Sequence, residues 1–157
     1  RRLVVHASED VGMADPNALV VATAALTAFE KLGAPEGLIP LSNAIIYVCE
    51  AEKSNSVILA MDAAKRAASE VRDDNIPPYL KDNSYGSRAD KAQSAGYKYP
   101  HNYGGWVRQQ YLPDSLKDEV FYRPQGRGYE KTVAETRRRK GMPDDTLPEP
   151  PKGRPHP

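Results

Sequence analysis

Cysteine is almost absent from this sequence, and long hydrophobic runs are absent altogether. Cys49 is the only cysteine in 157 residues, which excludes a disulfide framework within the chain and a zinc site made of several thiolates. Because Cys49 lies in an apolar helical stretch, we predict that it is a small core residue in a reducing compartment. No apolar run approaches the roughly 20 residues that span a bilayer. We therefore expect neither a membrane-spanning segment nor a membrane partner.

Sequence motifs for catalysis and cofactor binding are missing as well. A phosphate-binding loop needs the pattern G-x-x-x-x-G-K-S/T, and the double glycine Gly104-Gly105 has no lysine after it. No nucleophile elbow is present, and no sequence neighbour marks Cys49 as activated. The histidines are too far apart for a helical metal pair: His6, His101 and His156. We predict no catalytic residue, no cofactor and no metal in this chain; an active site built from residues distant in sequence stays open as an alternative.

The composition is that of an ordinary soluble protein, with 39% hydrophobic and 27% charged residues. The chain length predicts one domain with a tail rather than two domains. The sequence starts at Arg1-Arg2 without an initiator methionine, a signal-peptide core or a helix cap. We expect it to be a piece of a longer protein that begins inside a helix ending near Gly12.

Positive charge is concentrated in the second half of the chain. Residues 1–80 carry 7 basic and 11 acidic side chains and residues 81–157 carry 15 and 10, which together make the 22 and 21 of the whole chain. Four consecutive cations end the last expected helix: Arg137, Arg138, Arg139 and Lys140. They can oppose the negative end of the helix dipole, or they can bind DNA phosphates. Both interpretations stay open.

Helix signals dominate the first half of the chain. Asp15 can cap a helix that starts at Pro16, where the missing N–H of proline costs nothing. The apolar residues that follow recur at spacings of three and four: Leu19, Ala22, Leu26 and Phe29. This spacing predicts one apolar face, and Gly33 supplies a stop. The pattern therefore predicts a helix over 16–32.

Further helices are expected along the chain. The segment 40–51 is apolar on most sides and predicts a buried helix, although its β-branched residues also suit a strand. Ser54 can cap a longer helix to about Asp74. Small residues on this helix and on the helix at 16–32 are predicted to form the core of an all-α antiparallel bundle. Beyond the helix-breaking prolines we predict, in order, a short helix at 87–95, an irregular segment at 97–126, a charged helix at 128–140 and a proline-rich, extended or disordered tail.

Aromatic residues are concentrated between Tyr97 and Tyr129, a span that holds eight of the chain's twelve. The stretch KYPHNYGGWVRQQYLP at 98–113 contains four of them: Tyr99, Tyr103, Trp106 and Tyr111. Their rings can pack within the protein or anchor a subunit interface. They can also stack on the bases of single-stranded nucleic acid. From the residues alone we favour packing or an interface.

Five stretches occur in the order found in one known family. They are ASEDVGMADPNAL at 7–19, GAPEGLIPLSNAIIYV at 33–48, KSNS at 53–56, GYKYPHNYGGWVRQQYLP at 96–113 and FYRPQGRGYE at 121–130. Over about residues 1–140 the sequence resembles the C-terminal region of the replication-associated recombination protein A family, RarA or MgsA, whose eukaryotic relatives are the Werner-helicase-interacting proteins. The ordered set is more specific than any one of its motifs.

The resemblance implies a helical C-terminal domain over residues 1–140, similar to the collar domain of clamp loaders, with a long aromatic-rich arm and a separate tail at 141–157. It implies that the ATPase core, with ATP and Mg²⁺, belongs to the rest of the parent protein, and that this chain is a non-catalytic oligomerisation domain, typically of a homotetramer. It further implies a cytoplasmic, nucleoid-associated protein that acts in DNA replication, recombination and repair at stalled forks. DNA and single-stranded DNA-binding protein would be its partners. The alternative function is a module that binds DNA or a replication partner through residues 137–140 and the aromatic arm.

Overall fold

The computed structural model describes residues 1–71, 76–81 and 96–142. These residues form helices and turns and include no strand, which confirms the predicted all-α class. The chain divides into two compact units, the first made of Arg1–Asp62 with the segment from Phe121 onward, and the second of Ala63–Val120. The predicted helix at 87–95 and the proline-rich tail from 143 lie outside the described residues.

The first unit begins with a helical segment that changes its winding twice. Helix α1 (Arg2–His6) continues into a π-helical turn at Ala7–Val11 and a 3₁₀ turn at Gly12–Ala14. Gly12 has a φ of 51°, and a Cβ at this position would lie 2.8 Å from the Ser54 carbonyl oxygen. The predicted end of a helix near Gly12 is confirmed, and the position needs glycine both for its backbone angle and for the close contact.

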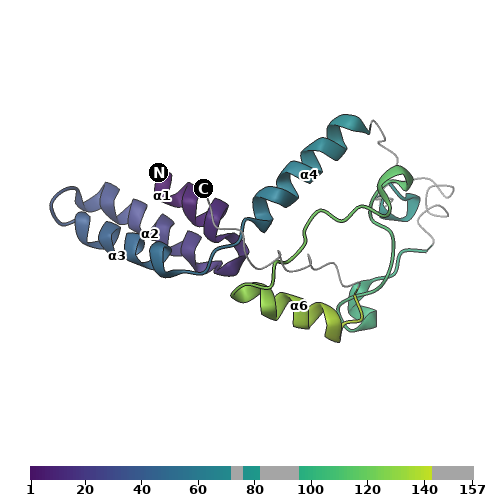
Figure 1. Ribbon diagram of the computed structural model, residues 1–157. Coiled ribbons are helices and arrows are strands. Elements are labelled where there is room, and N and C mark those ends of the chain that lie inside the picture. The colour runs from purple at the N-terminus through teal and green to yellow at the C-terminus, as the bar shows by residue number, and fades with distance from the viewer. Residues whose placement is uncertain (72–75, 82–95, 143–157) are drawn as a thin grey trace, which may run out of the picture. The chain divides into compact units, whose positions relative to one another are not determined.

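Helices α2 (Asn17–Leu32) and α3 (Leu38–Glu50) form a hairpin beside α1 (Figure 1). Asp15 caps α2 as predicted, because its Oδ1 accepts a 3.0 Å hydrogen bond from the Asn17 backbone N–H. Gly33 ends α2 at a φ of 68° and donates its N–H to the Phe29 carbonyl oxygen. The segment predicted at 40–51 is a helix that starts slightly earlier, and the strand alternative is wrong.

The core of the first unit is built mainly from alanine. Among the described residues, the buried hydrophobic side chains are Ala7, Val11, Ala14, Ala18, Ala22, Ala25, Ala44, Val48 and Ala134. Small side chains at a helix contact let the helix axes approach to about 8 Å, the lower end of the usual range. The small-residue face predicted for the helix at 16–32 is therefore confirmed.

Two predicted core residues are instead exposed. Leu19 has 41% of its surface accessible, because α2 turns Ala18, Ala22 and Ala25 inward and leaves the next position outside. Cys49 is also exposed, because α3 buries Val48 and the neighbouring position points away from the hairpin contact. Both predictions were wrong for one reason: the apolar periodicity of these helices extends around more than one face.

Helix α4 (Ser56–Glu70) begins in the first unit and ends in the second. It starts two positions after the predicted cap, although the Ser54 Oγ does accept a 3.3 Å hydrogen bond from the Ser56 N–H. Only Ser56 is buried along this helix, so the prediction that its small residues form the core was wrong. The alanines of α4 are half-buried or exposed.

The described part of the second unit beyond α4 is mostly irregular. It contains short 3₁₀ turns at Pro78–Leu80, Pro100–Tyr103 and Asp114–Leu116. The Tyr79 hydroxyl donates a 2.6 Å hydrogen bond to the Gln110 carbonyl oxygen and so connects two of these stretches. No helix in the described residues is both long enough and apolar enough to cross a bilayer.

Helix α6 (Tyr129–Arg139) returns the chain to the first unit and packs against the turn at Gly12–Ala14. It lies within the charged helix predicted at 128–140. Gly128 precedes it with a φ of 48°, and a Cβ there would lie only 2.1 Å from the Ala14 carbonyl oxygen. The contact between α6 and the N-terminal turns therefore requires glycine at this position.

Candidate functional site

The outward face of α2 is an apolar stripe with a hollow in its surface. The hollow has a volume of about 680 Å³ and is lined by Leu19, Val20, Thr23, Ala24, Thr27, Ala28 and Lys31. These positions repeat at intervals of four, so they form adjacent ridges along one side of the helix. Large side chains lie at the N-terminal end of the stripe, and small ones lie beyond them. The stripe lies opposite the alanines that α2 buries.

Helix α3 also presents large apolar side chains to solvent. The exposed large hydrophobic residues of the α2–α3 hairpin are Leu19, Val20, Leu32, Leu38, Ile39, Ile45 and Ile46. Val20, Ile39 and Ile46 have 64%, 74% and 63% of their surfaces accessible. Apart from Val48, the buried side chains of this hairpin are alanines, whereas these seven large apolar side chains are exposed, which is an unusual distribution. Large exposed apolar areas are typical of interaction sites for proteins or membranes, or of ligand-binding grooves.

Hydrogen bonds at one end of the hairpin fix this surface in place. The Tyr47 hydroxyl of α3 donates a 2.8 Å hydrogen bond to Oδ2 of Asp15, the residue that also caps α2. The bond to the Asp15 carboxylate is the main cause of a raised pKa for Tyr47, because it stabilises the protonated phenol. One carboxylate therefore sets both the start of α2 and its position relative to α3.

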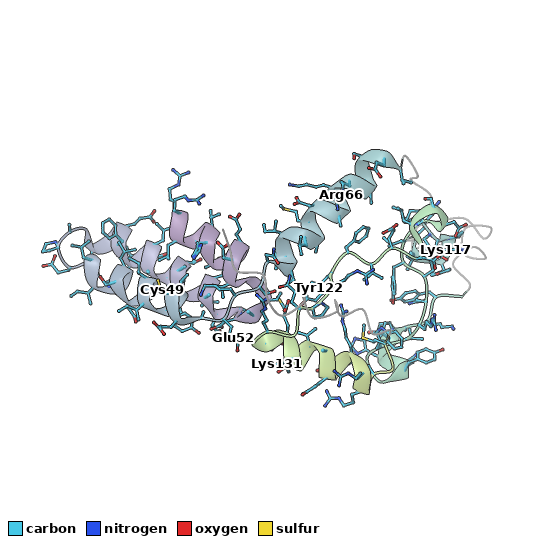
Figure 2. The ribbon with its side chains drawn as sticks, in the orientation of Figure 1. Cys49, Glu52, Arg66, Lys117, Tyr122 and Lys131 are labelled. Carbon is cyan, nitrogen blue, oxygen red and sulfur yellow. The ribbon has the colours of Figure 1, made fainter. Side chains whose placement is uncertain are left out.

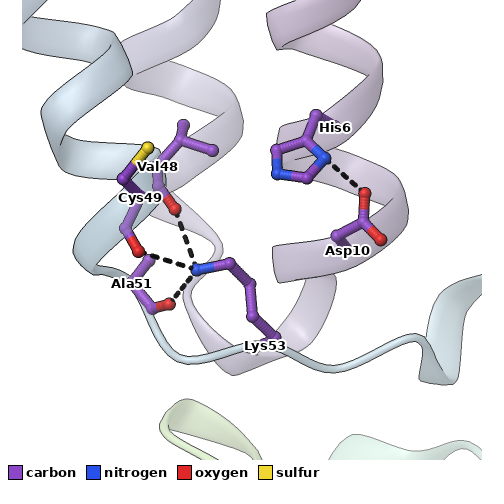
Figure 3. A network of polar contacts seen from close by, with 6 residues as sticks. All are labelled: His6, Asp10, Val48, Cys49, Ala51 and Lys53. Atoms are coloured by element: carbon purple, nitrogen blue, oxygen red, sulfur yellow. Dashed lines mark hydrogen bonds and ion pairs between the residues drawn. The ribbon is translucent and has the colours of Figure 1, made fainter. Parts of the chain in front are cut away.

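Lys53 closes the C-terminal end of α3 (Figure 3). Its Nζ donates hydrogen bonds to the carbonyl oxygens of Val48 at 2.9 Å and Cys49 at 3.1 Å, and also to that of Ala51. The last carbonyls of a helix have no partner within the helix, and they carry the negative end of its dipole. The ammonium group meets both needs, because it donates to these carbonyl oxygens and carries a positive charge.

A fully buried carboxylate, that of Glu130, joins three segments of the first unit. Its Oε1 accepts hydrogen bonds from the Ser56 hydroxyl at 2.6 Å and the Tyr122 hydroxyl at 3.3 Å. Its Oε2 accepts a 2.8 Å hydrogen bond from the Gln125 backbone N–H. Glu130 has 0% of its surface accessible and lies in the first turn of α6, where the helix dipole favours a negative charge. We call these four residues the Glu130 cluster.

The Tyr122 side chain is held between opposite charges. Burial, followed by the charge and hydrogen bond of Glu130, raises the pKa of Tyr122 to about 12. On its other side, the Arg137 guanidinium carbon lies 5.2 Å from the centroid of the Tyr122 ring, within the range of a cation–π contact. Arg137, the first of the four predicted cations, therefore packs against the protein.

A row of polar contacts continues outward from the Glu130 cluster. The Glu52 carboxylate accepts a 3.0 Å hydrogen bond from the Gly128 N–H and lies 4.0 Å from the Lys131 ammonium group. Glu52, Tyr122 and Lys131 are labelled in Figure 2. Arg127 donates a 3.1 Å hydrogen bond to the Lys53 carbonyl oxygen. These contacts attach the segment before α4 to the start of α6.

The predicted aromatic anchors lie in the second unit. Tyr99, Tyr103 and Tyr111 are exposed, and Trp106 is half-buried. The Tyr99 ring is tilted at 45° to that of His101, with 4.9 Å between the centroids. Gln109 organises the stretch by bonding to both the N–H and the carbonyl oxygen of Lys98, at 3.1 and 3.0 Å, and by donating to the Tyr111 hydroxyl at 2.8 Å.

The remaining predicted cations lie at the C-terminal end of α6. Arg138, Arg139 and Lys140 lie there, next to the last carbonyls of the helix, and all three are exposed. His6 pairs with Asp10 one turn away on the same helical segment. No group of acidic, histidine or cysteine side chains suited to a metal ion occurs within residues 1–71, 76–81 and 96–142.

Comparison with known proteins shows which protein family the chain belongs to. Residues 1–140 match the family model described as "MgsA AAA+ ATPase C terminal". The chain belongs to this MgsA C-terminal family. The match covers all five motifs, including the two that meet in the Glu130 cluster.

Relatives of this MgsA C-terminal chain include two proteins named for replication-associated recombination and one named as an ATPase. It is 45% identical over 129 residues to the replication-associated recombination protein A of Bacillus subtilis, covering 82% of this chain and 31% of that protein. It is 39% identical over 137 residues to the Haemophilus influenzae protein of the same name, covering 86% and 31%. It is 32% identical over 124 residues to the ATPase WRNIP1 of Dictyostelium discoideum, covering 78% and 14%. The chain thus spans less than a third of the length of each of these relatives.

The Glu130 cluster was missed by reasoning from the sequence. Ser56 and Glu130 each end a family motif, KSNS and FYRPQGRGYE, but no periodicity relates positions so far apart. The available signal was a single acidic residue in the first turn of a helix otherwise rich in cations. That signal predicts a favourable helix dipole and does not identify the hydroxyl groups that bind it.

Proposed function

We propose that this chain is a non-catalytic oligomerisation domain, extending over residues 1–140, of a RarA-like AAA+ ATPase. In this proposal ATP and Mg²⁺ bind elsewhere in the parent protein. The parent acts on DNA at stalled replication forks, in replication, recombination and repair, and associates with the nucleoid and with single-stranded DNA-binding protein. The family membership and the names of the relatives support these roles.

The inverted distribution of side chains on the α2–α3 hairpin is the observation that carries the proposal. Alanines form most of the core, together with Val11 and Val48, whereas seven large apolar side chains of the hairpin remain exposed. Burying one such large apolar side chain contributes about 1.5–3 kcal/mol. A second copy of the chain that covers this surface would supply the apolar contacts that the small core lacks. The expected assembly is a homotetramer, in keeping with the closed symmetry of most soluble oligomers.

Light scattering and sedimentation of the purified chain test the proposal. Wild type should give the mass of an oligomer, and the double variant Val20→Asp/Ile46→Asp should give a smaller species, because each carboxylate would be buried at the interface. Val5→Asp is the matched control, since Val5 is an exposed apolar residue of α1. A wild-type chain that stays monomeric at high protein concentration contradicts the proposal.

DNA binding is the second candidate, and the cationic end of α6 favours it. Arg138, Arg139 and Lys140 are available to phosphates, whereas Arg137 packs on Tyr122. Replacing these three cations with glutamine should weaken binding to duplex DNA. The slope of log K against log salt concentration should become less steep by about 0.9 for each phosphate that is no longer neutralised. Fluorescence anisotropy at two salt concentrations measures this, with Lys65→Gln/Arg66→Gln in α4 as a control that also removes cations. Absence of binding at low salt would exclude this candidate.

The aromatic arm stays a prediction within both candidates. Tyr99, Tyr103 and Tyr111 offer exposed rings that suit either an anchor in a neighbouring subunit or a stack on unpaired bases. Replacing all three with alanine should lower the oligomer mass in the first case and the affinity for single-stranded DNA in the second. The two measurements on one variant separate the roles.

A further inference from the structure

We propose that α2 pairs with α2 of a second copy, antiparallel, across a twofold axis that passes near Thr23 and Ala24. The inference rests on the oligomerisation function proposed above and adds which helix makes the contact and in which direction. The occupant of the hollow on α2 is thus the same stripe of another chain. In such an isologous interface each contact occurs twice, related by the axis.

The outward side of α2 has a consistent line of residues for this contact. With 3.6 residues per turn, positions 20, 24, 27 and 31 follow one another along one side of the helix. Ala18, Ala22 and Ala25 lie on the opposite side and are buried against the rest of the unit. Pairing through the outward line therefore leaves the core of the unit unchanged.

The sizes of the side chains select the antiparallel direction. Leu19 and Val20 project from the N-terminal part of the stripe, and the small residues Ala24, Thr27 and Ala28 line its C-terminal part. An antiparallel copy places each Val20 over the partner copy's position 27, because positions 20 and 27 lie on the same side of the helix. A parallel copy would place large residues against large residues and leave the hollow empty, which sacrifices dispersion attraction.

Charge selects the same direction. Lys31 ends the stripe at the C-terminal end of α2, and Asp15 lies just before its N-terminal end. The antiparallel axis places the Lys31 ammonium group of each copy beside position 16 of the other, within reach of the neighbouring Asp15 carboxylate. Asp15 accepts one hydrogen bond on each oxygen from Asn17 and Tyr47, and a carboxylate has about four lone-pair sites. A parallel pair would bring two Lys31 ammonium groups together.

Disulfide cross-linking tests both the surface and the direction. The background is Cys49→Ser, which removes the sole cysteine of the chain. With a rise of 1.5 Å per residue, the two copies of position 20 lie about 10 Å apart along the paired helices, too far for a disulfide. Val20→Cys/Thr27→Cys should therefore form covalent dimers under mild oxidation, as should Ala24→Cys near the axis. Val20→Cys alone and Thr27→Cys alone should not.

The outcomes separate this inference from the function on which it rests. Covalent dimers in the double variant and in Ala24→Cys, without dimers in the single Val20 and Thr27 variants, support antiparallel pairing. Cross-linking of Val20→Cys alone, as efficient as that of the double variant, overturns the direction. An oligomeric chain in which no variant cross-links overturns the α2 contact and leaves the oligomerisation function standing. A monomeric Cys49→Ser chain with wild-type circular dichroism overturns both.

Discussion

The Ser56 hydroxyl donates a 2.6 Å hydrogen bond to the Glu130 carboxylate, although the two residues are 74 positions apart in the sequence. Both side chains are buried, and Glu130 also accepts hydrogen bonds from Tyr122 and from the Gln125 backbone. A buried carboxylate is costly unless its lone pairs are occupied. The three donors of the Glu130 cluster meet that requirement.

Removal of the Glu130 carboxylate should destabilise the first unit. In Glu130→Ala the Ser56 hydroxyl and the Gln125 N–H lose their acceptor, and we expect a loss of about 3 kcal/mol in the free energy of unfolding. Urea denaturation measures it. The control Glu135→Ala, at an exposed position of the same helix, should change the value by less than about 0.5 kcal/mol. Equal losses in the two variants would count against a structural role for the cluster.

Stability should fall in alkaline solution because of Tyr122. The folded chain raises the pKa of this phenol to about 12, whereas in the unfolded chain it ionises near its ordinary value of 10.0. The contribution of Tyr122 is therefore complete below pH 10 and is lost as the pH rises toward 12. The difference in free energy of unfolding between wild type and Tyr122→Phe should narrow over this interval. A pH-independent difference would refute the assignment.

Gly128 and Gly126 should differ sharply in their tolerance of alanine. Both have positive φ, at 48° and 70°, which costs a non-glycine residue about 1–2 kcal/mol. A Cβ at Gly126 meets no atom within 4 Å, whereas one at Gly128 would lie 2.1 Å from the Ala14 carbonyl oxygen. Gly128→Ala should therefore lose several times more stability than Gly126→Ala in thermal unfolding. Similar melting temperatures for the two variants would show that α6 does not pack closely on this turn.

Lys53 should stabilise the end of α3. Lys53→Met keeps the length of the side chain and removes the donor to three carbonyl oxygens, so we expect a loss of about 1 kcal/mol. Faster amide hydrogen exchange in the last turn of α3 would locate the effect. Lys65→Met, at an exposed site of α4, is the control and should leave that exchange rate unchanged.

Local signals predicted the helices well because they act over a few residues. The Asp15 cap and the Gly33 stop set the bounds of α2, and each works through backbone groups that are adjacent in sequence. The charged helix after Gly128 followed from the same kind of signal. The family motifs also predicted the relation to MgsA proteins, which the comparisons confirm.

The direction in which each helix faces was harder to predict. On α2 and α3 apolar residues surround most of the helix, so periodicity could not decide between Leu19 and Ala18 as the buried position. The α2 stripe that we propose as an assembly surface is apolar for the same reason that a core is apolar. A sequence that encodes both therefore loses the contrast on which the prediction of burial depends.

The Glu130 cluster also holds together the two segments that lead into and out of the second unit. Ser56 lies just before the second unit in sequence and Tyr122 just after it, and both hydroxyls bind the same carboxylate oxygen. The segments that flank residues 63–120 in sequence are therefore held together, because Ser56 and Tyr122 of the first unit both bind Glu130. After a single proteolytic cut within residues 63–120, α6 should remain bound to α1, α2 and α3 through non-covalent contacts alone.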